Sequence, residues 1–106
     1  HASWKSGSIV ERESADTIAD GIAVRTPVPE AVTDMVGIVD DVLLISEESL
    51  KQAMKLVFDK AGLVTEPAGV AGIAAILDHQ SLRKSKLATV ICGSNLTAEQ
   101  MEMWLS

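Results

Sequence analysis

The stretch Thr65-Glu66-Pro67-Ala68-Gly69-Val70-Ala71-Gly72 opens the most hydrophobic part of this 106-residue chain. Thr65 can cap a helix that begins at Glu66 and Pro67, because proline is tolerated in a first turn and a carboxylate there complements the helix dipole. The apolar residues that continue to Leu77 cover nearly every face of that helix. We therefore expect it to be buried against other structure.

An amphipathic helix is predicted just before this stretch. Ser46 is a suitable N-cap, Glu47 and Glu48 occupy the first turn, and Gly62 supplies the stop. Apolar residues recur at helical spacing between these ends, namely Leu50, Met54, Val57, Phe58 and Ala61.

Two shorter helices are predicted nearer the ends of the chain. Pro29 and Glu30 open one that runs to about Val36. Thr97 and Gln100 form a capping box for another that ends at about Leu105.

Short continuous apolar runs at 42–45 and 87–91 are typical of buried parallel strands. The resulting order of helices and strands predicts an α/β fold, in which short parallel strands are joined by right-handed crossovers and packed against helices. Residues 3–29 lack sustained periodicity, so we expect an extended or looped segment that lines a site or is held by another part of the protein. We expect one domain over 1–106, with the α/β unit at 30–106.

Composition excludes several classes of function. A net charge of −6 argues against nucleic-acid or anionic-membrane partners, and a single cysteine excludes an internal disulfide and the common zinc patterns. The longest apolar stretch, 69–77, is far shorter than the roughly 20 residues that cross a bilayer, and no signal peptide opens the chain. We expect a cytoplasmic protein, whose first residue His1 suggests a start inside a longer product.

Three segments with small residues where apolar structure ends carry a family resemblance: 14–24, 65–72 and 89–96. In this order they resemble the fold type II pyridoxal-phosphate enzymes, in the branch of the threonine and serine dehydratases and serine racemase. The resemblance runs from about Ser3 to Leu96 and covers the later part of that family's catalytic domain. It implies that this chain is a fragment of the large domain, completed by the remainder of the catalytic domain.

The resemblance implies cofactor-binding roles for four residues. Cys92 matches a serine or cysteine that faces the pyridine nitrogen, where a neutral group leaves the nitrogen unprotonated; apolar burial would keep this thiol neutral. Glu66 matches a glutamate near the pyridine side, and Gly21 a glycine whose backbone borders the cofactor. Gly93 follows Cys92 in a run of small residues that lets a planar ring approach the backbone.

From the residues alone, each position has a structural alternative. A lone cysteine is commonly a buried core residue, and a glutamate at a helix start is favoured by the dipole. Gly21 is equally suited to a turn with positive φ. Asp16 and Asp20 are interpreted as surface groups. His79 is interpreted as a surface residue that complements the dipole at the end of a helix.

The resemblance implies a parent enzyme, a homo-oligomeric lyase that uses pyridoxal 5'-phosphate to deaminate L-threonine, and less well L-serine, to an oxoacid and ammonia. No lysine here matches the family's Schiff-base lysine, and the loops that bind phosphate and substrate carboxylate are missing. The metal ligands of the racemase branch would lie upstream of Ser3. We therefore expect this chain alone to be inactive. Serine racemase is the close alternative, and a non-catalytic α/β binding or interaction module is a different one.

Overall fold

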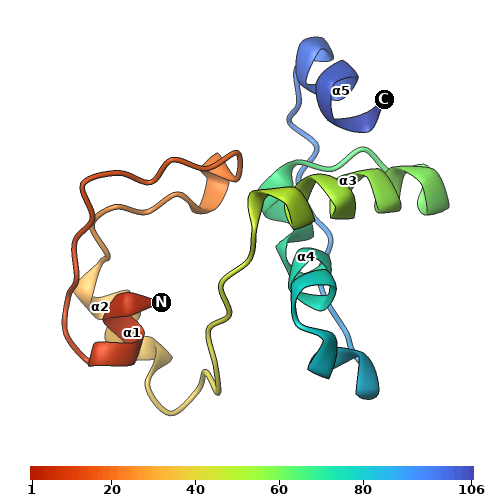
Figure 1. The fold of residues 1–106 in the computed structure, drawn as a ribbon. Coiled ribbons are helices and arrows are strands. Elements are labelled where there is room, and N and C mark those ends of the chain that lie inside the picture. The colour runs from red at the N-terminus through yellow and green to blue at the C-terminus, as the bar shows by residue number, and fades with distance from the viewer. The chain divides into compact units, whose positions relative to one another are not determined.

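The computed structural model describes residues 1–106, which divide into two units (Figure 1). The first unit comprises residues 1–17 and 23–44, and the second comprises residues 18–22 and 45–106. The five residues 18–22 thus belong to the second unit, although the residues on both sides of them belong to the first.

The first unit contains two short helices, α1 (Ala2–Ser6) and α2 (Pro29–Met35). Helix α2 begins with Pro29 in its first turn and agrees with the sequence prediction. Helix α1 lies in the region predicted to be looped; its Ser3 hydroxyl accepts the N–H of Val10 at 2.9 Å. The long segments between the helices have no regular structure, as expected for them.

The second unit is built on α3 (Glu47–Ala61), the longest helix of the chain. The Ser46 side chain accepts the N–H of Ser49 at 3.1 Å, and Gly62 ends the helix with φ 66°, so both predicted ends are confirmed. The face predicted to be apolar supplies most of the core, whose buried hydrophobic residues are Ala19, Leu50, Ala53, Met54, Val57, Val70, Ala74 and Leu105.

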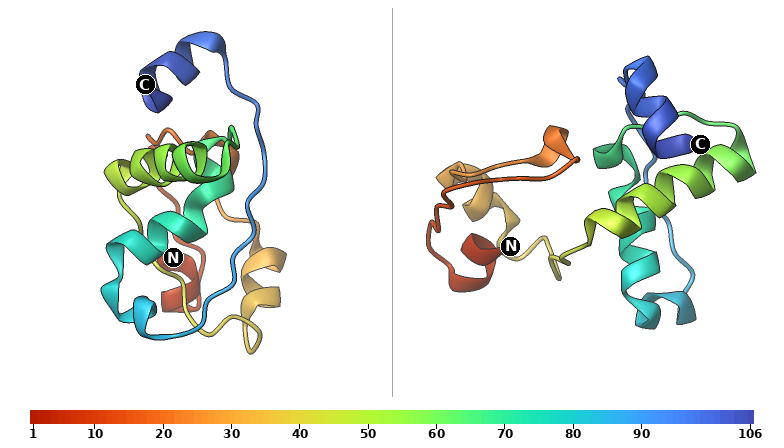
Figure 2. Two further views of the ribbon diagram at one scale, coloured as in Figure 1. Left: turned by 90° about the vertical axis from the view of Figure 1, so that its right-hand side faces the viewer. Right: turned by 45° about the horizontal axis from the view of Figure 1, so that its top comes forward.

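The predicted apolar helix forms as a short 3-10 turn, η2 (Pro67–Val70), that continues into α4 (Ala71–Asp78). Val70 and Ala74 are fully buried, whereas the larger apolar residues of α4 are half-buried, so the predicted burial is only partly realised. A further 3-10 turn, η3 (Gln80–Lys84), follows α4. Figure 2 shows the chain then running back along α4 to the last helix.

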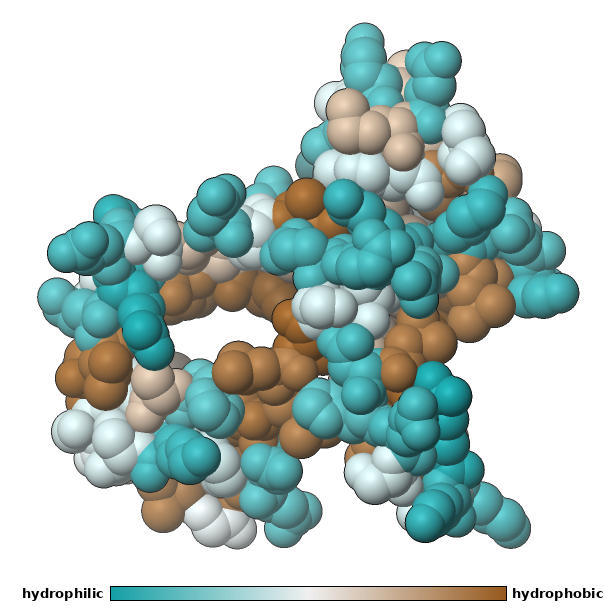
Figure 3. All heavy atoms as spheres, viewed as in Figure 1, coloured by the Kyte–Doolittle hydropathy of each residue, from teal (hydrophilic) through white to brown (hydrophobic).

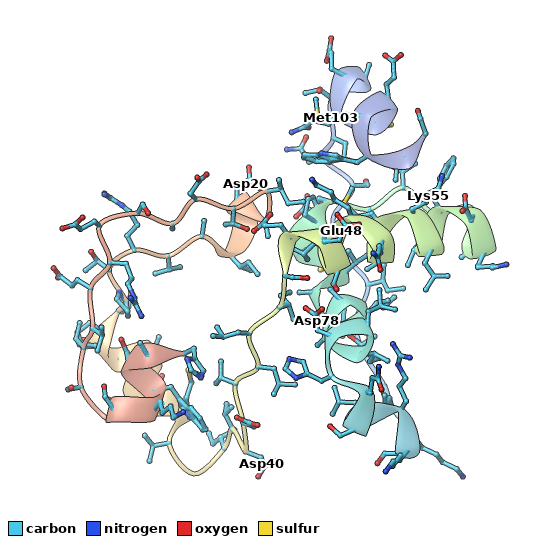
Figure 4. The ribbon with its side chains drawn as sticks, in the orientation of Figure 1. Asp20, Asp40, Glu48, Lys55, Asp78 and Met103 are labelled. Atoms are coloured by element: carbon cyan, nitrogen blue, oxygen red, sulfur yellow. The ribbon has the colours of Figure 1, made fainter.

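That last helix, α5 (Ala98–Leu105), has the predicted capping box, in which Thr97 and Gln100 each bond the other's backbone N–H. It packs against α3 through Leu105, which is buried in the core. The Lys55 ammonium of α3 also donates to the carbonyl oxygen of Leu105 at 3.2 Å (Figure 4).

The structure contains no β-strand, so the predicted parallel strands at 42–45 and 87–91 are not formed. An extended segment becomes a strand only when a neighbouring segment offers N–H and C=O groups in register. In the second run, Thr89 instead lies beside Gly72 of α4. Its Val90 side chain is 78 % exposed, which is not the environment of a central strand.

Candidate functional site

Two backbone hydrogen bonds join the start of η2 to the turn that follows residue 91. The N–H of Glu66 donates to the carbonyl oxygen of Gly93 at 3.1 Å, and the N–H of Cys92 donates to that of Gly69 at 3.2 Å. A Cβ on Gly69 would overlap with the backbone carbonyl of Cys92. The missing side chain at Gly69 therefore allows the two segments to meet.

The Glu66 side chain reinforces this junction. Its Oε2 atom accepts the N–H of Asn95 at 3.4 Å, a longer bond than the two backbone ones. A Cβ on Gly93 would overlap with the Glu66 side chain, and Gly93 has φ +68°, in the left-handed region that favours glycine. Gly93 is thus favoured both by its backbone conformation and by the position of Glu66.

Gly21 reaches the same place from a third segment. It lies in the 3-10 turn η1 (Asp20–Ile22), which belongs to the second unit. A Cβ on Gly21 would stand 3.3 Å from the Cβ of Ala68 and 3.6 Å from Oε1 of Glu66. Gly21 does not have positive φ, so the alternative explanation as a left-handed turn glycine is wrong. Its small size serves the close approach to Glu66 and Ala68.

Cys92 is exposed and forms no disulfide. The expectation that apolar burial surrounds its thiol is therefore wrong for this chain, and so is the alternative of a buried structural cysteine. The reason lies in the missing strand: a cysteine at the end of a central strand would be covered by the sheet and its helices, whereas 87–91 has no strand neighbour.

The structure thus brings together the four residues singled out in the sequence: Gly21, Glu66, Cys92 and Gly93. A carboxylate, an accessible thiol and two glycines meet at one junction. The space beside Gly21 and Gly93 is taken by Glu66 and Ala68, while the exposed thiol can serve as a hydrogen-bond partner. The thiol and the carboxylate are groups that can hydrogen-bond the nitrogen of a heteroaromatic ring.

The other polar residues noted in the sequence lie elsewhere. Asp16 belongs to the first unit, and Asp20 is exposed in η1. His79 follows the last residue of α4, as predicted for a helix end.

Sequence reasoning missed a bond between η1's segment and α3. Oε2 of Glu47 accepts the N–H of Ile18 at 3.0 Å. In the sequence Glu47 is one of two adjacent first-turn glutamates, and nothing local distinguishes it from Glu48. Only the folded structure distinguishes the two, because it places Ile18, which lies 29 positions away in the chain, beside Glu47.

It also missed the junction between the end of α4 and the start of α3. The Asp78 carboxylate accepts the N–H of Ser46 at 2.6 Å and the hydroxyl of Ser49 at 2.5 Å (Figure 4). These bonds, that of Ser49 first, hold the pKa of Asp78 below its ordinary value, although desolvation opposes them. The Ser46 hydroxyl also donates to Oδ1 of Asp78, at 3.3 Å.

None of the helices combines the length and the apolar character needed to cross a bilayer.

Comparison with known proteins adds a family to this geometry. The L-threonine ammonia-lyase of Thermotoga maritima is 32% identical over 101 residues, which are 95% of this chain and 25% of that protein. The catabolic L-threonine dehydratase TdcB of Escherichia coli K12 is 32% identical over 98 residues, or 90% of this chain and 30% of the relative. The chain thus spans about a quarter to a third of the length of these relatives.

Solved structures agree with the sequence relatives. The threonine deaminase of T.th. superposes with a TM-score of 0.83 at 31% identity, over 91% of this chain and 35% of that one. Serine racemase from Dictyostelium discoideum gives a TM-score of 0.75 at 31% identity, over 91% of this chain and 31% of that one. The family described as pyridoxal-phosphate dependent enzyme matches residues 1–93. The chain belongs to this family, whose cofactor is pyridoxal phosphate.

Proposed function

We propose that this chain is part of a threonine ammonia-lyase that deaminates L-threonine, and less well L-serine, to an oxoacid and ammonia. The observation that carries the proposal is the meeting of Gly21, Glu66, Cys92 and Gly93, which come from three separate segments. The two sequence relatives described above bear the name threonine ammonia-lyase or threonine dehydratase, which supports this choice of reaction.

The residues of the junction fit one side of the cofactor. The Cys92 thiol is accessible and is assigned to the pyridine nitrogen, where an uncharged partner supplies no proton to the ring. Glu66 holds the turn that follows Cys92 by accepting the N–H of Asn95. The backbones of Gly21 and Gly93, which lie against the Glu66 side chain, are assigned to the border of the cofactor. Pyridoxal phosphate, when bound, withdraws electrons from the substrate carbon whose bonds are broken.

The remaining groups of the reaction are assigned to other parts of the catalytic domain. These are the Schiff-base lysine, the phosphate-binding loop and the loop that holds the substrate carboxylate. We also propose that residues 42–45 and 87–91 become parallel strands of a fold type II large domain when its other strands are present, because a strand needs paired neighbours. The complete enzyme is proposed to be a cytoplasmic homo-oligomer.

Two substitutions of Cys92 in the complete enzyme test the proposal. Cys92→Ser should retain much of the dehydratase activity, because a hydroxyl is also neutral and occupies the same place. Cys92→Asp should lose most of it, because a carboxylate would favour a protonated pyridine nitrogen. Steady-state rates with L-threonine and the absorbance spectrum of the bound cofactor provide the two measurements.

The control for this comparison is Ser94→Asp, which introduces the same charge two residues further along the turn. A loss confined to Cys92→Asp, with a shifted cofactor spectrum, supports the pyridine-facing role. Equal activity and unchanged spectra in all three variants would show that Cys92 does not face the ring.

Serine racemase is the second candidate, favoured by the superposition on the enzyme from Dictyostelium discoideum. Elimination and racemisation give different products from L-serine. Chiral analysis of the remaining serine, run beside an assay for the oxoacid, separates the two: accumulation of D-serine faster than oxoacid would favour the racemase.

A further inference from the structure

The segment Ile18–Ile22 is held in the second unit by contacts and not by its neighbours in the chain. Residues 17 and 23, which flank it, both belong to the first unit. Ala19 is only 1 % exposed and belongs to the core formed with α3 and α4, and Ile18 packs against that core. Hydrophobic contacts of this kind are not directional.

A directional bond from α3 completes this attachment. The Glu47 carboxylate accepts the N–H of Ile18 at 3.0 Å. A bond from a backbone N–H to a charged carboxylate is stronger than one between neutral groups and fixes direction as well as distance. The donor precedes Gly21 by three residues, and Gly21 lies against Ala68 and the Glu66 carboxylate.

We infer that Glu47 is a positioning residue for the candidate site. By holding Ile18, it keeps the η1 turn at the distance from Glu66 at which the Gly21 backbone borders the cofactor. The inference rests on the proposed function, since it assumes that Gly21 lies beside pyridoxal phosphate. Glu47 itself is not assigned any contact with the cofactor or the substrate.

The adjacent Glu48 provides a matched control. Both glutamates lie in the first turn of α3, so both complement the positive end of the helix dipole to a similar degree. Oε1 of Glu48 accepts from the Gln52 side chain at 3.1 Å, a contact within α3 itself (Figure 4). Removing either carboxylate takes one charge from the first turn of α3, but of the two only Glu47 bonds the segment of Gly21.

The experiment compares Glu47→Ala, Glu47→Gln and Glu48→Ala in the complete enzyme. Hydrogen exchange of the peptide covering residues 18–22 reports on the attachment, and the dissociation constant for pyridoxal phosphate reports on the site. Glu47→Ala should speed exchange by about threefold to tenfold, as expected for one charge-assisted hydrogen bond, and weaken cofactor binding by a similar factor. Glu47→Gln should stay close to wild type, because its amide oxygen can still accept the Ile18 N–H. Glu48→Ala should leave both the exchange of residues 18–22 and the dissociation constant close to wild type.

The outcomes separate the inference from the proposed function. Equal exchange in Glu47→Ala and Glu48→Ala would overturn the inference, and so would faster exchange in Glu47→Ala without weaker cofactor binding. Faster exchange and weaker cofactor binding in Glu47→Ala, with both close to wild type in Glu47→Gln, would support the inference. A wild-type enzyme that does not bind pyridoxal phosphate would refute the proposed function, while the exchange data would still decide whether Glu47 holds the segment.

Discussion

At the scale of single residues, the predicted capping role of Thr65 is wrong, because the 3-10 turn that follows has Glu66 at its N-cap and no side-chain cap bond. The Thr65 side chain is only 3 % exposed, and its Oγ1 atom has no hydrogen-bond partner. An unsatisfied hydroxyl costs free energy, because folding removes its bonds to water without replacing them. Thr65 immediately precedes Glu66, so this unfavourable group is located at the edge of the candidate site.

We expect Thr65→Val to stabilise the protein by about 1 kcal/mol, because valine keeps the β-branched shape and removes the unpaired hydroxyl. Urea unfolding at neutral pH measures the change. Thr65→Ser is the control: it keeps the hydroxyl, loses a buried methyl and should destabilise. A valine variant less stable than wild type would mean that the hydroxyl has a partner in solution.

At the scale of elements, glycines set how closely η2 and α4 approach the segment that leads to Cys92. A Cβ on Gly72 would overlap with the Thr89 side chain, and one on Gly69 with the Cys92 carbonyl. Figure 2 shows this segment running along the helix. The position of Cys92 therefore depends on two residues that have no side chain.

The substitution Gly72→Ala tests this packing against helix propensity. Helix propensity alone predicts that alanine raises the free energy of unfolding by about 1 kcal/mol. Overlap with Thr89 predicts the opposite, a decrease in the free energy of unfolding of about 1–3 kcal/mol. We expect the decrease to dominate, as measured by the urea midpoint.

A second change then checks that Thr89 is the cause. Thr89→Gly removes the overlapping side chain, so Gly72→Ala should be much less destabilising in the Thr89→Gly background than in wild type. Equal effects in the two backgrounds would contradict the contact.

The junction between α3 and α4 provides a pH-dependent prediction at the same scale. The folded pKa of Asp78 lies below its ordinary value of 3.8, mainly because Ser49 and Ser46 donate to the carboxylate. Its contribution to stability is therefore present at neutral pH and is lost as the pH falls through the folded pKa. We expect Asp78→Asn to lower the urea midpoint at pH 7 and to have a progressively smaller effect as the pH falls through the folded pKa of Asp78.

Asp59→Asn is the matched control, since it removes the same charge from an exposed position of α3 away from the junction. It should not reproduce the pH-dependent difference. An Asp78→Asn variant whose destabilisation does not change with pH over this range would exclude the charged hydrogen bonds as the source of the effect.

At the scale of the whole molecule, the chain leaves many large apolar side chains exposed. Figure 3 shows hydrophobic residues at the surface among hydrophilic ones. Those of the second unit that are exposed include Leu56, Phe58, Leu63, Leu87, Val90, Ile91, Met101 and Met103. Contiguous apolar surface beyond a few hundred Å² usually marks an interface.

We expect the 106-residue chain, when isolated, to self-associate and to bind a hydrophobic dye. Sedimentation velocity over a range of concentrations measures the association. Val90→Lys should reduce both association and dye binding, whereas Lys84→Ala, on the polar turn η3, should not. A compact monomer at high concentration without dye binding would contradict this expectation.

We also expect the isolated chain to be inactive when mixed with pyridoxal phosphate and L-threonine, because the groups assigned to the chemistry lie in other segments. Formation of the oxoacid, followed with a hydrazine reagent, is the measurement. Turnover above that of free pyridoxal phosphate would place the missing groups within these 106 residues.

The sequence by itself determined both ends of α3 and the start of α5. Caps at Ser46, Gly62 and Thr97 act on backbone groups within about four residues, so their signals are local and the structure confirms them. The four site residues could also be selected, through the resemblance of short segments to a family. The predicted strands do not form in this chain, because a strand depends on partners elsewhere, which an apolar run does not reveal.

Only the tertiary structure decided which residues meet. Glu47 and Glu48 are equivalent in sequence, yet only Glu47 accepts the N–H of Ile18. In the sequence Gly69 and Gly72 are ordinary small residues. The fold shows why they are glycines, because Cys92 and Thr89 pack against them. These contacts join residues far apart along the chain, so their formation depends on the packing of α3 and α4, which no local pattern encodes.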